Sequence, residues 1–150
     1  MRAALMDLAP EKFLSGKVLK YCLPLIEGRP GPDTPSLKRL ALGQGRLDQI
    51  HDSDEGMRYM AVIELRAGGL RGNHYHKVKE ERIYVIAGRL RVHVEDPAAK
   101  ERVVIPLAAG ELIVIPAGVA HVLEPLEPGQ GIEFSPTRFD PGDIFPCRLV

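Results

Sequence analysis

From Met57 onwards, the sequence is a succession of short strand-like segments separated by turns rich in glycine and proline. The clearest segment is RLRVHVE, residues 89–95, in which Leu90, Val92 and Val94 alternate with charged or polar residues. Alternation with a period of two places these apolar side chains on one face of an extended strand. Other segments that favour strands occupy residues 57–65, 81–87, 102–107, 111–115 and 131–134. Such strands, with little helical periodicity between them, predict an all-β fold, and their number and length favour a jelly roll with few short helices.

The first 50 residues are harder to interpret. The segment EKFLSGKVLKYCLPLI, residues 11–26, fits a short helix followed by a strand, and a loop rich in proline and glycine at residues 27–36 ends it. Residues 37–45 fit a further strand. Because a chain of 150 residues favours one domain, we expect one domain overall. In this domain residues 1–50 are an N-terminal extension of strands and loops, and residues 51–150 form the barrel.

Composition and charge exclude some classes of function. The 20 basic and 20 acidic residues give a formal net charge of zero, so the charge favours neither nucleic acid nor an anionic membrane surface as a partner. The longest apolar stretch, around IVIPAGVAHVL, is interrupted by Pro116, Gly118 and His121, and the apolar run at the N-terminus is broken by Asp7. The sequence therefore predicts neither a membrane helix nor a secretion signal. We expect a cytoplasmic protein with a small-molecule ligand.

The two cysteines, Cys22 and Cys147, are far apart and match no C-x-x-C pattern. This spacing indicates neither a disulfide framework nor a zinc ribbon. Two reduced thiols are the interpretation that fits a cytoplasmic protein, and a single bridge between them stays open.

Two of the five histidines, His74 and His76, lie two positions apart in RGNHYH. On an extended segment, residues i and i+2 project from the same face, so both imidazoles point the same way. The pair is compatible with ordinary surface residues, with an acid/base pair or with half of a metal site. Glu80 or Glu81 at the start of the following strand, and His121 after the turn PAGVAH, offer a third and a fourth ligand.

Three imidazole nitrogens and one carboxylate oxygen form a donor set that suits one divalent transition metal ion, such as Fe, Mn, Ni, Co, Cu or Zn. The set is too rich in nitrogen for Ca²⁺ or Mg²⁺, which prefer oxygen ligands. Four protein ligands around an octahedral ion leave two positions open for water, oxygen or a bidentate substrate. Open positions are typical of a working site, and a purely structural ion is the alternative.

Two segments together resemble a known superfamily. Residues 68–88, GGLRGNHYHKVKEERIYVIAG, resemble the first cupin motif, a glycine followed by H-x-H, a glutamate and a second glycine at set spacings. Residues 110–121, GELIVIPAGVAH, resemble the second cupin motif, a glycine followed by P-x-G and a histidine. The resemblance implies the cupin double-stranded β-helix, which is a jelly-roll barrel. It also implies a metal held by His74, His76, Glu81 and His121.

The same resemblance favours Glu81 over Glu80 as the ligand, because only Glu81 leaves six residues before Gly88, as the first motif requires. We then expect Glu80 to be a solvated neighbour. The second motif usually closes with an asparagine, where this chain has Glu124 and Pro125. This departure leaves the four expected ligands intact.

The stretch RGNHYH, residues 71–76, is also similar to the start of the site in cupins of bacterial polysaccharide and deoxysugar biosynthesis. One subset of those proteins, the ketoisomerases, uses H-x-H for proton transfer without a metal. Under that interpretation His74 and His76 are acid/base residues. The presence of Glu81 and His121 in register favours the metal-binding interpretation instead.

We therefore expect a metal-dependent enzyme, of the isomerase, dioxygenase or decarboxylase class, that acts on a small polar substrate related to a carbohydrate or a keto acid. Arg71 is a candidate for a charge-assisted contact with a carboxylate or phosphate, or else a solvated loop residue. Two alternatives stay open: a non-catalytic cupin that binds or senses a small molecule, and a metal-free sugar-nucleotide isomerase. We also expect a homodimer, because cupins of this size are commonly dimers and residues 1–50 exceed what a minimal barrel needs.

Overall fold

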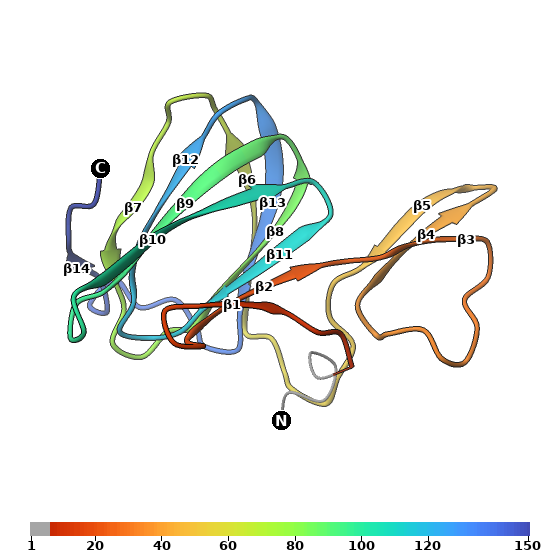
Figure 1. Ribbon diagram of the computed structural model, residues 1–150, viewed down its shortest axis with the longest axis horizontal. Helices are drawn as coiled ribbons and strands as arrows, with labels where there is room; N and C mark the ends of the chain where they lie inside the picture. Colours follow the sequence, from red (N-terminus) through yellow and green to blue (C-terminus); the bar gives the residue numbers. More distant parts are fainter. Residues whose placement is uncertain (1–6) are drawn as a thin grey trace.

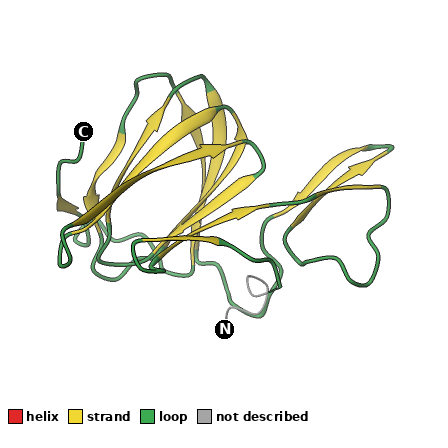
Figure 2. Cartoon of the chain, viewed as in Figure 1, coloured by secondary structure: helices red, strands yellow, loops and turns green. Residues whose placement is uncertain are grey.

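The computed structural model describes residues 7–150, and all regular structure in this range is β-strand (Figures 1 and 2). The prediction of an all-β fold is confirmed. The few short helices that we expected do not occur in the described range, and no helix there is long and apolar enough to cross a membrane. The strands are β1 (Glu11–Phe13), β2 (Val18–Cys22), β3 (Leu25–Glu27), β4 (Lys38–Leu42), β5 (Gly45–Gln49), β6 (Tyr59–Leu65), β7 (Arg71–Tyr75), β8 (Glu81–Ala87), β9 (Arg89–Asp96), β10 (Glu101–Ala108), β11 (Glu111–Ile115), β12 (Ala120–Pro125), β13 (Gly129–Ser135) and β14 (Phe145–Pro146).

Two sheets face each other and form a jelly-roll barrel (Figure 1). The first sheet has six strands in the order β1-β2-β11-β8-β13-β6, and the second has five in the order β10-β9-β12-β7-β14. Neighbouring strands are antiparallel in both sheets. The chain crosses repeatedly from one sheet to the other, as from β7 to β8 and from β8 to β9. This arrangement agrees with the cupin double-stranded β-helix that the sequence motifs imply.

The core lies between the two sheets, and its residues follow the predicted alternation. On β9, Leu90, Val92 and Val94 are at most 1% exposed, whereas Arg89 and Arg91 are exposed. The same apolar cluster contains Ile83 and Val85 of β8, Ile105 and Leu107 of β10, and Ile113 and Ile115 of β11. Burial of such a side chain contributes about 1.5–3 kcal/mol relative to leaving it exposed. The core therefore holds the two sheets together and fixes the strands that carry the candidate site.

The helix predicted at the start of residues 11–26 is wrong, because this segment forms β1, a tight turn and β2. In the turn, Leu14, Ser15 and Gly16 have φ angles of 51°, 56° and 85°, a left-handed conformation that reverses the chain. After the turn, Val18 of β2 joins the interior core, while Tyr21 joins a cluster on the outer face of the same sheet. A strand buried on both faces lacks the alternation that reveals a strand in sequence.

The N-terminal region contributes to the barrel in two ways. Its strands β1 and β2 extend the six-stranded sheet beside β11. It also covers the outer face of that sheet, where Leu37 packs with Tyr84 of β8 and Phe134 of β13, and where the Tyr84 hydroxyl donates a hydrogen bond to Asp48. Strands on both sides of residue 50 thus share one sheet. The division into an extension and a barrel at that residue stays a prediction.

The remaining three strands, β3, β4 and β5, form a separate small sheet that extends away from the barrel (Figure 1). We call residues 25–49, which contain this sheet, the arm. Cys22 lies on β2 just before the arm, and Cys147 follows β14 near the C-terminus; both are free thiols.

Candidate active site

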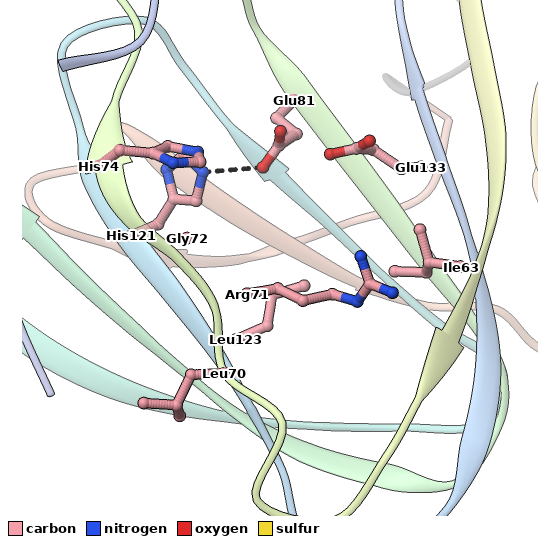
Figure 3. Close-up of a pocket in the computed structure, with 9 residues that line it drawn as sticks. All are labelled: Ile63, Leu70, Arg71, Gly72, His74, Glu81, His121, Leu123 and Glu133. Carbon is pink, nitrogen blue, oxygen red and sulfur yellow. Dashed lines mark ion pairs between the residues drawn. The ribbon is translucent and has the colours of Figure 1, made fainter. Parts of the chain in front are cut away.

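The four predicted ligand residues lie together inside the barrel, and one donor atom of each lies within 4.8 Å of the others (Figure 3). His74 is on β7, and His76 follows the end of that strand. His121 is on β12, directly opposite His74 in the register of the two strands. Glu81 begins β8 in the facing sheet. The barrel therefore brings together side chains from both sheets, and their role as ligands stays a prediction.

A close approach of two backbones positions the histidines. At Gly72 the main chain of β7 passes so near β12 that a Cβ atom there would lie 2.5 Å from the backbone oxygen of His121. The φ angle of Gly72 is +119°, and the register of the two strands shifts between His121 and Val122. Only glycine tolerates such an approach with a positive φ. The resulting irregularity sets His74 and His121 beside each other, with ring centroids 4.9 Å apart.

The two buried histidines both turn Nε2 towards the carboxylate of Glu81. The distance from Nε2 of His121 to Oε2 of Glu81 is 2.8 Å, and that from Nε2 of His76 to Oε1 is 3.5 Å. On the other side of each ring, Nδ1 lies 2.7 Å from the backbone oxygen of Asp143 for His76 and 3.2 Å from that of Val119 for His121. A carbonyl oxygen only accepts hydrogen bonds, so these contacts assign the proton to Nδ1 in each ring.

This assignment leaves both Nε2 atoms as lone-pair acceptors that face a carboxylate, which is also an acceptor. Both atoms are buried, and neither forms a hydrogen bond of normal geometry. Two acceptors at this distance need a positive charge between them, either a proton on the ring or a metal cation. Since the Nδ1 contacts orient the rings as in histidines that bind metals, the four residues fit a divalent transition metal.

Burial and neighbouring charges shift the pKa values at the site. Burial, and next the nearby imidazoles of His121 and His76, lower the pKa of His74 to about 4. Burial raises the pKa of Glu133 to about 7, and the adjacent Glu81 carboxyl adds to this shift. Burial alone would also raise the pKa of Glu81, but the neighbouring imidazoles of His121 and His76 outweigh it and hold this pKa well below its usual range. The His74 imidazole is therefore neutral at pH 7, and Glu81 is ionised.

A cavity of about 340 Å³ opens onto this group of residues. It is lined by Ile63, Leu70, Arg71, Gly72, His74, Glu81, His121, Leu123 and Glu133 (Figure 3). His76 does not line it and is only 5% exposed. Of the two histidines in H-x-H, only His74 therefore meets a ligand in the cavity directly. In Figure 3, Glu133 projects towards Glu81 from the other side, and both carboxylates lie at the same end of the cavity.

Arg71 lies along the wall of the cavity, below the imidazoles and carboxylates in the view of Figure 3. Its Nε and Nη2 atoms donate hydrogen bonds to the backbone oxygen of Glu64, at 3.3 and 3.0 Å. Within residues 7–150, Arg71 forms no ion pair with an acidic side chain. The guanidinium is thus held in place by the backbone and keeps its charge available to an anionic group, as the sequence led us to expect.

Several residues around the site were not identified from the sequence. Glu133 lines the cavity, Lys79 is buried beside Glu81, and the backbone oxygen of Asp143 lies at His76. Glu133 and Asp143 lie more than 50 positions after the motif residues that they contact, so no local pattern marks them. The only signal in the sequence for Lys79 is its position two residues before Glu81.

Two neighbours of the motif make their contacts outside the site. Tyr75 packs away from the site, because its ring stacks on Phe145 with centroids 5.4 Å apart. The interpretation of Glu80 as a solvated residue is wrong. Its carboxylate lies 2.8 Å from Nη2 of Arg82, which is 1% exposed and also contacts Glu55. A buried guanidinium needs such carboxylate partners, so Glu80 has a structural role.

Comparison with known proteins agrees with this architecture. Residues 61–128 match the model of the cupin domain. No curated protein matches the chain in sequence. Among solved structures, a dTDP-4-dehydrorhamnose 3,5-epimerase from Sulfolobus tokodaii is similar, with a TM-score of 0.71 and 20% identity over 93% of this chain and 81% of that one.

Two further structures are similar. One is a dTDP-6-deoxy-D-glucose-3,5-epimerase from Legionella pneumophila, with a TM-score of 0.70 and 14% identity over 93% of this chain and 77% of that one. The other is a TDP-quinovose 3,4-ketoisomerase from Campylobacter jejuni, with a TM-score of 0.64 and 16% identity over 73% and 88% of the two chains. At these identities the likeness shows a shared fold. The domain match, both sequence motifs and the fold lead to one conclusion: residues 61–128 of this chain belong to a cupin domain.

Proposed function

We propose that this protein is an isomerase or epimerase that transfers a proton next to the carbonyl group of a small, carbohydrate-related keto compound. The observation that carries this proposal is the cavity, in which His74 and Glu133 face the same space of about 340 Å³. Both are side chains able to exchange protons with a bound ligand. The similar solved structures, two sugar epimerases and a ketoisomerase, support this reaction class.

The chain's own residues suffice for such a transfer. Neutral His74 accepts the proton from the carbon next to the carbonyl, and protonated Glu133 donates a proton to the carbonyl oxygen, which gives an enediol or enol. Return of a proton to a carbon and removal of the one on oxygen complete an isomerisation or epimerisation, so that no atom is gained or lost. Ile63, Leu70 and Leu123 form the apolar part of the cavity wall. Arg71 offers its charge to an anionic group of the substrate.

Proton exchange in D₂O tests this proposal directly. Keto sugars, both free and nucleotide-linked, are incubated with the protein, and NMR follows the loss of the proton next to the carbonyl and the appearance of an isomer. We expect exchange in the wild type and a decrease of about 10²- to 10⁴-fold in His74→Gln and in Glu133→Gln. His93→Gln is the control, because His93 lies on β9 outside the cavity, where it pairs with Glu124 of β12. Full exchange in both site variants would rule out these roles.

A metal-dependent form of the same site is the second candidate. It is favoured by the two buried Nε2 atoms of His76 and His121, which face Glu81 without normal hydrogen bonds. A divalent transition metal would be held by His74, His76, Glu81 and His121, and when bound it would supply a Lewis acid that polarises a substrate oxygen. Glu133 then remains the carboxyl group of the cavity that is free for proton transfer.

Elemental analysis decides between the two forms. If the site holds a metal, purified tag-free protein carries about one transition metal ion per chain, and His76→Ala or Glu81→Ala loses most of it, whereas His93→Ala retains it. If the protein stripped of metal exchanges protons at the full rate, the metal is not required and the first form stands. A bound metal without turnover on any keto compound would instead support the third possibility, a binding or sensing module.

A further inference from the structure

Lys79 is a buried lysine that the proposed reaction does not use. It lies in the loop between β7 and β8, two residues before Glu81, and is only 5% exposed. Lysine is almost never buried to this degree unless its charge is paired, because removing an ammonium group from water costs several kcal/mol. The surroundings of its Nζ atom should therefore explain why it is there.

The ammonium group of Lys79 lies beside two carboxylates at the end of the cavity. Its Nζ atom is 3.6 Å from Oε1 of Glu81 and 4.0 Å from Oε1 of Glu133. These two carboxyl groups lie close enough together for each to shift the pKa of the other. Two carboxylates this close repel each other when both are ionised. A positive charge next to both offsets that repulsion and favours the arrangement in which Glu81 faces the histidines.

Aromatic rings fix the ammonium group from the other side. Nζ lies 4.2 Å from the centroid of the Tyr59 ring and 5.9 Å from that of Phe139, within the range of a cation–π contact. Tyr59 and Glu133 are also neighbours, since each shifts the pKa of the other. Rings and carboxylates thus surround the charge of Lys79, so its position is defined rather than free to move with the loop.

The backbone of the loop is held as firmly as the side chain. The carboxylate of Asp143 accepts hydrogen bonds from the backbone N–H groups of Lys77, Val78 and Lys79, at distances of 2.7, 3.2 and 3.0 Å. These hydrogen bonds therefore fix the backbone from which the Lys79 side chain extends. Lys77 offers a comparison within the same loop, because it is exposed, lies over the ring of Phe145 and forms no ion pair within the described residues.

From this geometry we propose that Lys79 is a positioning residue, whose ammonium group holds the Glu81 carboxylate in contact with His76 and His121. It does not touch the ligand, since it does not line the cavity. This inference deepens the proposed function, because it identifies what orients the central carboxylate of that site. Its test needs neither substrate nor metal, so its failure would leave the proposed function standing.

The position of the Glu81 carboxylate distinguishes a positioning role from a mere nearby charge. In the wild type, Oε2 of Glu81 lies 2.8 Å from Nε2 of His121, and Oε1 lies 3.5 Å from Nε2 of His76. If Lys79 were only a nearby charge, Lys79→Met would leave both contacts in place. If Lys79 positions Glu81, the same substitution turns the carboxylate away from both rings, while the barrel around it stays the same.

The experiment compares crystal structures of the chelator-treated wild type, Lys79→Met and the control Lys77→Met. We expect both contacts of Glu81 with the imidazoles to be lost in Lys79→Met and kept in Lys77→Met. Lys79→Cys should behave as Lys79→Met, and alkylation with 2-bromoethylamine, which rebuilds an ammonium group of nearly the same reach, should restore the contacts. Wild type treated in the same way accounts for reaction at Cys22 and Cys147. Unchanged contacts of Glu81 in Lys79→Met overturn the proposal.

A second measurement on the wild type covers the case in which the variants do not fold. An ammonium group enclosed by two carboxylates and two rings exchanges its hydrogens slowly with water, so that its Nζ–H signal is visible in cold, mildly acidic solution. We expect this signal for Lys79 and not for Lys77. Equally fast exchange at both lysines overturns the proposal.

Discussion

At the scale of single residues, Gly72 shows how tightly the site depends on the backbone. An added Cβ atom would meet the backbone oxygen of His121 at 2.5 Å and the Cα atom of Val122 at 3.0 Å. Both are main-chain atoms of β12, so neither can move aside by a side-chain rotation. Any larger residue at this position must push β7 away from β12, and thereby separate His74 from His121.

We therefore expect Gly72→Ala to lower the free energy of unfolding by roughly 2–5 kcal/mol, from the sum of overpacking and a strained φ angle. Gly16→Ala is the matched control, because Gly16 also has a positive φ, but a Cβ atom added there would meet no atom of the described residues within 4 Å. Urea denaturation of both variants measures the difference. Equal losses of stability would show that the close approach of the two strands contributes nothing.

The residues of the site differ in how far the sequence reveals them. His74, His76, Glu81 and His121 were predicted, because the spacing of two motifs reflects strand and turn geometry that is local in the chain. Lys79, Glu133 and Asp143 were not, because their contacts join distant parts of the chain; the bond from the Lys79 amide to Asp143 spans 64 residues. Only the folded barrel determines such pairs. The same limit explains Glu80, whose ion pair depends on the burial of Arg82.

At the scale of elements, the C-terminal segment, residues 136–150, supports the strand that carries the histidines. Its strand β14 pairs with β7, where Phe145 lies opposite Tyr75. Further along, the backbone N–H of Cys147 donates a hydrogen bond to the backbone oxygen of Asn73. Asp143, in the same segment, fixes the loop after β7 through its carboxylate and contacts His76 through its backbone oxygen. No local pattern in the sequence indicates this support, because it joins segments that are far apart in the chain.

Asp143→Asn tests this support through its pH dependence. Burial opposes ionisation of Asp143, but the backbone N–H groups of residues 77–79 outweigh it and hold the pKa of this carboxyl below its usual value. A lowered pKa in the folded state adds stability that is present above the unfolded pKa of about 3.9 and is lost as the pH falls through the folded pKa. We expect the variant to melt at a lower temperature than the wild type at pH 7, and the difference to shrink below about pH 4.

Melting curves by circular dichroism between pH 3 and pH 7 measure this difference. Asp140→Asn is the control, since the carboxylate of Asp140 is exposed and, within residues 7–150, accepts a hydrogen bond only from the backbone N–H of Gly142. A constant difference between wild type and Asp143→Asn over the whole range would contradict the role of the ionised carboxylate.

At the scale of the whole molecule, the arm is the part whose small sheet lies outside the core of the barrel. Its three strands are only three to five residues long, and a small sheet of this kind needs packing on one face to be stable. Ile26, Leu40 and Leu47 lie opposite one another across the three strands, so they share a face. Leu47 at the edge of this face is 47% exposed. An apolar face on a projecting arm fits the homodimer that we expect from the sequence.

If the arm pairs two chains, light scattering gives a mass near twice the 16.5 kDa of one chain. Leu47→Asp then shifts the measured mass towards that of the monomer, because a carboxylate buried in an apolar contact loses its hydration without gaining a partner. Val104→Asp is the matched control. Val104 is exposed to a similar degree, 46%, but lies on β10 at the edge of the five-stranded sheet of the barrel. If the wild type is monomeric at every concentration, the arm does not mediate pairing. If Val104→Asp dissociates the dimer and Leu47→Asp does not, the chains pair through β10 instead of the arm.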